Sequence, residues 1–355
     1  MPAEFGPSLL VRRLEAALRD IQSSRVQVRR AAARDLSQYI DSSARTRIVG
    51  RLEQLAMEDA DIEVRVQGVL ALADGGAVES VGLLVNLARA GVPRIRQIAL
   101  LALGELAEPG SAQAVEVALE AVESALPGLR YQGLVTLKNL QQGAVLGLII
   151  SKTVDDDSEV RWVAIRLIDE LCFPNASRDS ISRVLEAWDA DNTRKLQSLL
   201  EDPDRRVAVA ATLLLSRLGV VTAIDKLPTL LSKASHKLDP QDEEAAIEII
   251  GQLGLSHAKP ELERRAWRLL WEAPTTWPAR VALAQLGDPR ARQSILQSLY
   301  SNSPLKCARA IEAIGKIGLE EGRARLQHLL ANPAGYDVET IRTALDRLNS
   351  AKQPR

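Results

Sequence analysis

Aromatic side chains are scarce in this sequence, which has two Phe, five Trp and four Tyr among 355 residues. Deep ligand pockets are usually lined by such rings, so the composition does not favour a protein built around a large small-molecule site. Leu, Ala, Val and Ile supply the apolar volume instead. With 46% hydrophobic and 26% charged residues, the chain has the composition of a folded protein rather than a disordered one.

Cysteine and histidine are scarcer still. Cys172 and Cys307 lie 135 positions apart within apolar helical patterns, which predicts reduced core thiols rather than a disulfide framework. The three histidines, His236, His257 and His328, are isolated, and no H-E-x-x-H, C-x-x-C, Walker, G-x-G-x-x-G or G-x-S-x-G motif is present. We therefore predict a protein that is not an enzyme and that holds no cofactor and no metal.

Long apolar segments are also missing. The longest uncharged runs, 98–104 and 144–150, are far too short to span a bilayer, and no charged-then-apolar leader opens the chain. We therefore expect a cytoplasmic protein without membrane insertion.

Net charge is close to zero, at −1, which argues against a chain-wide surface for nucleic acid. The charge is nevertheless uneven along the chain. Residues 1–51 carry ten arginines and five acids, whereas residues 52–157 carry fifteen acids and seven bases. A partner with basic flanks would complement the second segment. Two solvated faces of opposite bias would also explain the distribution.

What the sequence does contain is an internal repeat. Residues 61–76, 92–110, 126–143 and 157–171 each begin with a turn containing Asp or Pro, followed by an apolar residue and Arg. With the apolar residue as position 0, small or apolar residues recur at positions 4, 7, 8 and 11, the spacing of a helical stripe. Weaker copies occur near 28, 207, 242, 275, 306 and 337. The apolar-Arg pairs are Val64-Arg65, Ile95-Arg96, Leu129-Arg130 and Val160-Arg161.

A period of 31–34 residues with two helices and no strand pattern predicts an all-α fold, an α-solenoid of about ten helix-turn-helix units. We expect a right-handed superhelix and a single domain over 1–355. The segment near 173–201 is longer than the period allows, which predicts an insertion or an irregular repeat there.

The Asp-x-x-Val-Arg element at 61–65 and 157–161 resembles HEAT-like repeats, in particular the short kind found in phycobilisome lyase subunits and many bacterial scaffolds. The resemblance implies a repeat scaffold. The Asp is expected to cap the second helix of its repeat. The Arg is expected to reach that Asp, or its counterpart in the next repeat, along the seam between repeats. A role in contacting substrate is the less favoured alternative for these arginines.

Three enzymatic branches of HEAT-like proteins bear on function. The deoxyhypusine hydroxylase branch needs paired His-Glu sites, which are missing here. DNA glycosylases use an aromatic residue, an Asp and an Arg, and Trp162, Arg166 and Asp169 share a helical face, but the acidic segment 52–157 is a poor surface for duplex DNA. In a bilin lyase, Tyr131 and Trp162 would stack on the tetrapyrrole while arginines pair with its propionates. Bilin handling is therefore the main alternative function.

The second helix of each repeat usually lines the concave side of a solenoid. Its face away from the core stripe holds positions 2, 6 and 9, and there several repeats carry apolar residues. These residues are either core or an exposed groove that binds an amphipathic helix or extended peptide. We predict the groove, and with it a non-enzymatic scaffold that binds another protein. The candidate partner-binding residues are Val66, Val69, Leu101, Tyr131, Val135, Trp162, Arg166, Leu213, Trp277 and Val281.

Three of the five tryptophans, at 267, 271 and 277, fall within eleven positions. Trp267 and Trp271 are predicted to lie on the first helix of their repeat and to pack against a neighbouring repeat or turn. Trp277 occupies the same repeat position as Trp162, so it is the better functional candidate of the three.

Overall fold

The structure is a computed structural model that describes residues 7–141, 145–173, 190–232, 238–267, 273–333 and 335–350. All regular elements in these residues are helices, and no strand occurs among them, so the predicted all-α class is confirmed. The chain divides into two compact units, unit 1 (Met1–Leu196) and unit 2 (Gln197–Arg355). The division falls within the segment predicted to be irregular. A single continuous solenoid and its right-handed superhelix remain predictions.

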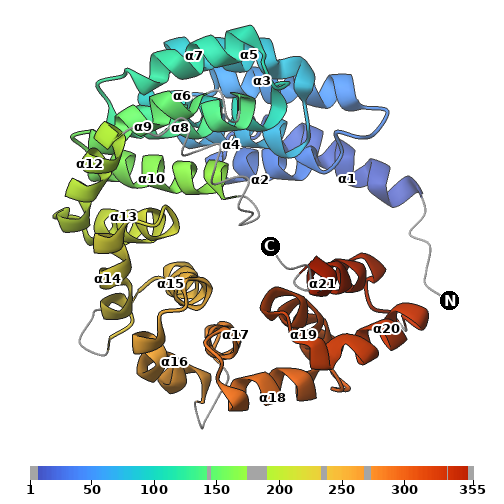
Figure 1. Cartoon of the computed structure of the whole chain (residues 1–355). Helices are drawn as coiled ribbons and strands as arrows, with labels where there is room; N and C mark the ends of the chain where they lie inside the picture. The colour runs from blue at the N-terminus through green and yellow to red at the C-terminus, as the bar shows by residue number, and fades with distance from the viewer. Residues whose placement is uncertain are drawn as a thin grey trace. The chain divides into compact units, whose positions relative to one another are not determined.

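Unit 1 is a series of antiparallel helical pairs, each made of a first and a second helix (Figure 1). The first helices are α1 (Pro7–Asp20), α3 (Arg45–Glu58), α5 (Val81–Ala90), α7 (Ala112–Val122) and α9 (Leu146–Ser151). The second helices are α2 (Val26–Ser37), α4 (Ile62–Asp74), α6 (Pro93–Leu106), α8 (Pro127–Gln141) and α10 (Ser158–Cys172). Short 3-10 turns η1 (Val78–Ser80) and η3 (Lys152–Val154) adjoin α5 and α9, and α12 (Ala190–Ser198) crosses into unit 2.

Unit 2 repeats the same arrangement (Figure 1). Its first helices are α14 (Val221–Leu230), α16 (Lys259–Ala266), α18 (Pro289–Ser298) and α20 (Arg323–Ala331). Its second helices are α13 (Arg205–Arg217), α15 (Pro240–Leu253), α17 (Thr276–Gln285), α19 (Pro304–Ile317) and α21 (Val338–Ser350). The 3-10 turns are η4 (Leu199–Glu201), η5 (Ser256–Ala258) and η6 (Glu320–Gly322).

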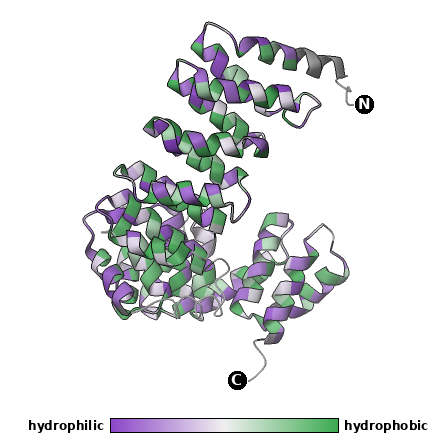
Figure 2. Cartoon of the chain, turned by 90° about the horizontal axis from the view of Figure 1, so that it is seen from above, coloured by the Kyte–Doolittle hydropathy of each residue, from purple (hydrophilic) through white to green (hydrophobic). Residues whose placement is uncertain are grey.

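Each unit buries its own apolar core between the two layers of helices. In unit 1 the second helices follow one another, with α4 packed between α2 and α6 and α8 between α6 and α10. The stripe residues Val64, Ile95, Leu129 and Val160 at position 0 are fully or almost fully buried. Hydrophobic and hydrophilic residues alternate along these helices (Figure 2), as amphipathic helices with one buried face require. The core stripe read from the sequence is therefore the core of the repeat.

The repeat motif also fixes where helices begin. The side chain of Asp61 accepts hydrogen bonds from the backbone N–H groups of Glu63 and Val64 at the start of α4, and Asp157 does the same at the start of α10. Such a cap satisfies donors that the helix itself leaves unpaired and is worth about 1 kcal/mol. The predicted capping role of these two aspartates is confirmed. Helix α6 has no capping acid and begins with Pro93 instead. Proline has no backbone N–H, so it leaves one fewer donor to be capped at the first turn.

Candidate functional site

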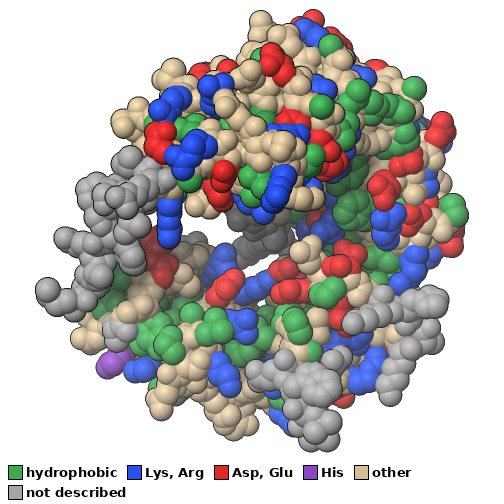
Figure 3. All heavy atoms as spheres, turned by 180° about the vertical axis from the view of Figure 1, so that it is seen from behind, with side chains coloured by type: hydrophobic (Ala, Val, Ile, Leu, Met, Phe, Trp, Pro, Cys, Tyr) green, Lys and Arg blue, Asp and Glu red, His purple; other side chains and the backbone are tan. Residues whose placement is uncertain are grey.

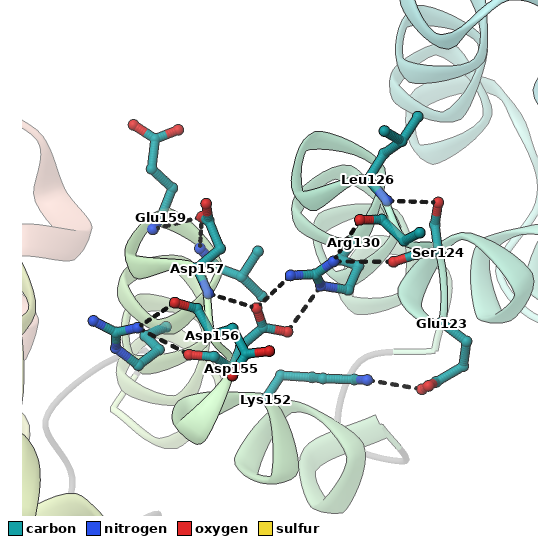
Figure 4. Close-up of polar contacts among 12 residues, drawn as sticks. Glu123, Ser124, Leu126, Arg130, Lys152, Asp155, Asp156, Asp157 and Glu159 are labelled. Carbon is teal, nitrogen blue, oxygen red and sulfur yellow. Dashed lines mark hydrogen bonds and ion pairs between the residues drawn. The ribbon is translucent and has the colours of Figure 1, made fainter.

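Two pairs of neighbouring repeats in unit 1 are joined by a largely buried arginine–aspartate pair, and we call these two pairs the seam. Arg29 of α2 donates from Nε and Nη2 to the two carboxylate oxygens of Asp59, at 2.6 and 2.9 Å, and Arg130 of α8 donates to Asp155 at 2.9 and 2.6 Å. Each arginine thus pairs with an aspartate in the turn that precedes the next second helix, and Figure 4 shows the pair of Arg130 and Asp155. All four side chains are at most 15% exposed. Two-pronged pairs of this kind fix the geometry between neighbouring repeats.

The partner of the motif arginine differs from the expectation. Asp61 and Asp157 were expected to lie within reach of these arginines, but their side-chain oxygens are used by the helix caps. The partners are Asp59 and Asp155, two residues earlier, which also accept the backbone N–H groups of Asp61 and Asp157 (Figure 4). One aspartate therefore caps the helix, and the other receives the arginine of the preceding repeat.

The remaining motif arginines bind backbone carbonyls instead. Arg65 donates to the carbonyl of Ala56 at 3.0 Å, and Arg96 donates to that of Ala88 at 2.9 Å. Arg161 donates to the carbonyls of Asp155 and Asp156. Such contacts satisfy carbonyls in and after the last turn of the preceding helix, where the helix dipole also favours a cation. These contacts lie within one repeat and not between two, so they give the arginines a structural role, but not the predicted one along the seam between repeats.

The seam changes the acidity of its carboxylates. Burial alone would raise the pKa of Asp59 and Asp155, but hydrogen bonds from the arginine and from the backbone, together with the guanidinium charge, hold both pKa values below the ordinary range. Both groups are therefore ionised at neutral pH and act as fixed anions inside unit 1.

The second-helix face of unit 1 consists of Leu101 on α6, Tyr131 and Val135 on α8, and Trp162 and Arg166 on α10. All five side chains are partly exposed. They come from adjacent helices, since α8 packs against both α6 and α10. Burial, and then the negative charges of Glu159 and Glu170, raise the pKa of the Tyr131 hydroxyl. Two partly exposed aromatic rings thus lie on this face, and acidic side chains lie near Tyr131.

Three of the candidate residues are core residues instead. Val69 is fully buried, and Val66 and Leu213 are 4% exposed, so none of them is accessible to a partner. Val69 also lies one position out of register with Leu101 and Val135. The residue at position 6 of its repeat is Leu70, which is partly exposed. At position 2, Val66 is too short to rise above its neighbours, whereas the rings of Tyr131 and Trp162 are large enough to remain partly exposed.

The other two candidates, Trp277 and Val281, line a hollow in unit 2 of about 360 Å³. We call it the Trp277 hollow. Its floor is α17, and its walls are α15 and α19. At the floor, α15 and α17 approach closely because Gly251 of α15 has no side chain. A methyl group at this position would lie only 2.9 Å from Ala282 of α17. The lining residues are Glu244, Glu248, Trp277, Pro278, Val281, Ala282, Gln285, Arg309, Glu312, Ala313 and Lys316.

Charged side chains surround this apolar floor. An ion pair between Lys316 of α19 and Glu248 of α15 joins the two walls. Glu244 lies one turn before Glu248 on the same wall, and Arg309 and Glu312 lie on the opposite wall. On the face drawn in Figure 3, unit 2 likewise shows hydrophobic side chains interspersed with charged ones. The hollow can therefore hold a side chain that is flat or apolar in one part and charged in another.

Sequence reasoning missed the charged residues of this hollow, although the signal was present. Glu244 and Glu248 are positions 2 and 6 of the weak repeat near 242, and Glu312 is position 6 of the copy near 306. These are the positions that carry Trp277 and Val281 in the repeat between them. The same register applied to all the weak copies identifies both walls.

Comparisons with known proteins agree with this architecture. A family model of HEAT repeats matches residues 49–138. The X-ray structure of YibA from Escherichia coli superposes with a TM-score of 0.54 at 16% identity, covering 81% of this chain and 98% of YibA. Residues 49–138 are therefore similar to HEAT repeats, and the chain has a HEAT-like repeat fold. A designed armadillo repeat protein aligns at 18% identity with a TM-score of 0.37, covering 58% of this chain and 99% of its own. No curated protein matches the sequence.

The structure describes two of the three clustered tryptophans, Trp267 and Trp277. The helix expected to carry Trp267 ends one residue earlier, at Ala266, and Trp271 lies outside the described residues. The guanidinium carbon of Arg290 lies 3.9 Å from the centre of the Trp267 ring, and that of Arg280 lies 5.2 Å from it. Trp267 also packs against the core of unit 2. The predicted packing role of Trp267 is confirmed, and cation–π contacts with Arg280 and Arg290 add to it.

The HEAT-like repeats bury their two cysteines, and neither forms a disulfide. Burial, and then the charge of Asp169, raise the pKa of the Cys172 thiol to about 12, so this thiol stays protonated at neutral pH. The described residues contain no group of three or more His, Cys, Asp or Glu side chains placed to hold a metal ion. No described helix is long and apolar enough to cross a bilayer.

Proposed function

We propose that this HEAT-like protein is a non-enzymatic scaffold that binds another protein through the second-helix face of unit 1. The observation that supports this proposal is the row of partly exposed Leu101, Tyr131, Val135 and Trp162 on three adjacent helices. Tyr and Trp side chains are among the residues that most often dominate the energy of protein interfaces. The partner is a helix or extended peptide that lays apolar side chains across this row.

The acidic charge of unit 1 indicates which charge the partner should carry. Residues 52–157 carry eight more acidic than basic residues, and Glu159 and Glu170 raise the pKa of Tyr131 on the face itself. Basic flanks on the partner would complement this potential, whereas the phosphates of nucleic acid would be repelled. A cytoplasmic location and a bacterial origin are parts of the same proposal.

The contacts of Arg130 and Arg161 favour the scaffold over bilin handling, since they leave Arg166 as the cationic side chain of the second-helix face. A bilin on Tyr131 and Trp162 would need cationic side chains for its propionates, and the arginines adjacent in sequence are Arg130 and Arg161. Arg130 is held by Asp155 and the carbonyl of Ser124, and Arg161 is held by the carbonyls of Asp155 and Asp156. Both guanidinium groups therefore already have partners within the protein.

The proposal is tested by isolating partners on the immobilised full-length protein and then measuring their affinity for variants. Trp162→Ala should weaken binding of the true partner by about 2 kcal/mol or more, because a half-exposed Trp at an interface loses most of its contact area on truncation. Its unfolding midpoint should change little. Leu119→Ala is the matched control, since Leu119 is 44% exposed on α7 in the other layer of unit 1. Intact binding by Trp162→Ala, with a large loss of stability, would assign the ring to the core and refute the proposal.

A further inference from the structure

The Trp277 hollow is lined by one more acidic side chain than basic ones. Lys316 is engaged by Glu248. Neither Glu244 nor Glu312 forms an ion pair with any described residue, and both are exposed. Arg309 alone stands against these two acids among the lining residues. The hollow therefore has one uncompensated negative charge, next to an aromatic ring.

An aromatic floor between acidic walls is complementary to a cation with a flat face. The Trp ring attracts a cation placed over it and is the best of the aromatic side chains at doing so. Carboxylates at the rim can accept the N–H groups of a guanidinium in a charge-assisted, two-pronged way. Trp277 also packs partly against the core of unit 2, which holds its ring in one orientation before any ligand arrives.

We propose that the Trp277 hollow binds an arginine side chain of a partner peptide, stacked on Trp277 and paired with Glu244 and Glu312. This inference rests on the proposed scaffold function, since it names the chemistry of the partner at a second site. The volume of about 360 Å³ suits a single side chain with its adjoining backbone rather than a whole helix.

Other occupants fit the hollow less well. An anion such as a phosphate would meet three glutamates, with Arg309 as the one lining base that is not already paired. A purely aliphatic segment would cover the apolar surface of Val281 and Ala313, but it would remove water from the charged walls without replacing the lost hydrogen bonds. An arginine avoids both costs, because its alkyl stem covers the apolar floor while its guanidinium reaches the carboxylates.

The experiment uses the full chain and two synthetic peptides, acetyl-Gly-Arg-Gly-amide and acetyl-Gly-citrulline-Gly-amide. Citrulline has the shape of arginine without its charge, so it isolates the electrostatic part of recognition. Binding is measured by NMR from the indole N–H signal of Trp277, assigned with the Trp277→Leu variant. We expect the arginine peptide to shift this signal in a saturable way and the citrulline peptide to bind at least about tenfold more weakly.

Two variants test the residues. Glu244→Gln keeps the size and exposure of the side chain, and it should weaken the arginine peptide by about three- to tenfold without changing the unfolding midpoint. Glu263→Gln is the matched control, because Glu263 is also exposed but lies on α16 in the other layer of unit 2. This variant should bind the arginine peptide as the wild type does. Equal binding of the two peptides, or full binding by Glu244→Gln, would overturn the inference.

The two proposals fail separately. Loss of the partner in Trp162→Ala together with no arginine binding in unit 2 would remove the inference and leave the scaffold function intact. Arginine binding at Trp277 with unchanged partner binding in Trp162→Ala would remove the unit 1 face as the interface.

Discussion

The residues that matter most to the architecture of unit 1 are the seam pairs, because each joins two repeats through charges that are largely removed from water. A guanidinium and a carboxylate in this setting repay their desolvation only while both are present. Removing one partner leaves the other charge buried and uncompensated. The effect of a substitution in the seam should therefore exceed that of an exposed ion pair by several-fold.

Arg130→Ala should lower the free energy of unfolding by about 3 kcal/mol, because Asp155 keeps its charge but loses both guanidinium hydrogen bonds. Arg94→Ala is the matched control. Arg94 lies 3.7 Å from Glu63, and both side chains are exposed, so its loss should cost less than about 0.5 kcal/mol. Urea denaturation followed by circular dichroism measures both. Equal effects of the two variants would show that the seam contributes nothing beyond surface pairing.

The seam also predicts a dependence of stability on pH. The pKa values of Asp59 and Asp155 are lower in the folded protein than their ordinary value, so the folded state binds fewer protons at these groups than the unfolded state does. Their stabilisation is complete above the unfolded pKa, roughly 3.9, and is lost as the pH falls through the lowered folded values. The unfolding free energy should therefore decline below about pH 4. In the Asp59→Asn, Asp155→Asn double variant the protein should be less stable at pH 7, and this decline should be shallower. Parallel curves for the two proteins would contradict the assignment.

At the scale of the helix, the sequence predicted the second helices of unit 1 well because their signals reinforce one another. In α4 and α10 three signals agree on where the helix begins and which face is buried. These signals are the capping Asp, the apolar residue at position 0, and the stripe at positions 4, 7, 8 and 11. The end of α16 was predicted less well. That helix stops at Ala266 with neither a glycine nor a proline there to mark its end, so its apolar pattern seemed to continue through Trp267.

The candidate site was predicted in part, and the reason for the misses is physical. Helical periodicity assigns a residue to a face, but exposure on that face also depends on what the neighbouring helices carry. Arg34 of α2 reaches α4, where its Nη2 donates to Gln67 at 3.4 Å. Val66, the residue before Gln67, is buried. On α8 and α10 the larger Tyr131 and Trp162 remain accessible. Side-chain size relative to neighbours is a tertiary property, so the sequence pattern of one repeat does not contain it.

At the scale of the whole chain, the two units repeat one design with different surfaces. The same repeat positions carry aromatic and aliphatic residues in unit 1 and an aromatic floor between charged walls in unit 2. A repeat architecture allows this division, because the stripe that holds a repeat together leaves the residues at positions 2 and 6 free to vary. Two different recognition chemistries can therefore follow one another along a single chain.

The charge of unit 1 leads to a prediction about the kinetics of partner binding. The excess of eight acidic residues in 52–157 should accelerate encounter with a partner that has basic flanks, and the acceleration should fade as salt shortens the Debye length from about 30 Å at 0.01 M to about 8 Å at 0.15 M. The triple variant Asp74→Asn, Glu105→Gln, Glu108→Gln removes three exposed charges that lie outside the seam. It should lower the association rate at 0.01 M salt and flatten its salt dependence, while the dissociation rate stays nearly constant.

The matched control for this prediction is Glu321→Gln, Glu339→Gln, Asp346→Asn. It makes the same change in net charge at exposed positions of unit 2. Stopped-flow association with the partner separates two explanations. If steering arises from unit 1, only the first triple variant slows association. If the two triple variants slow it equally, net charge alone controls the rate, and the acidic segment has no special part in recognition.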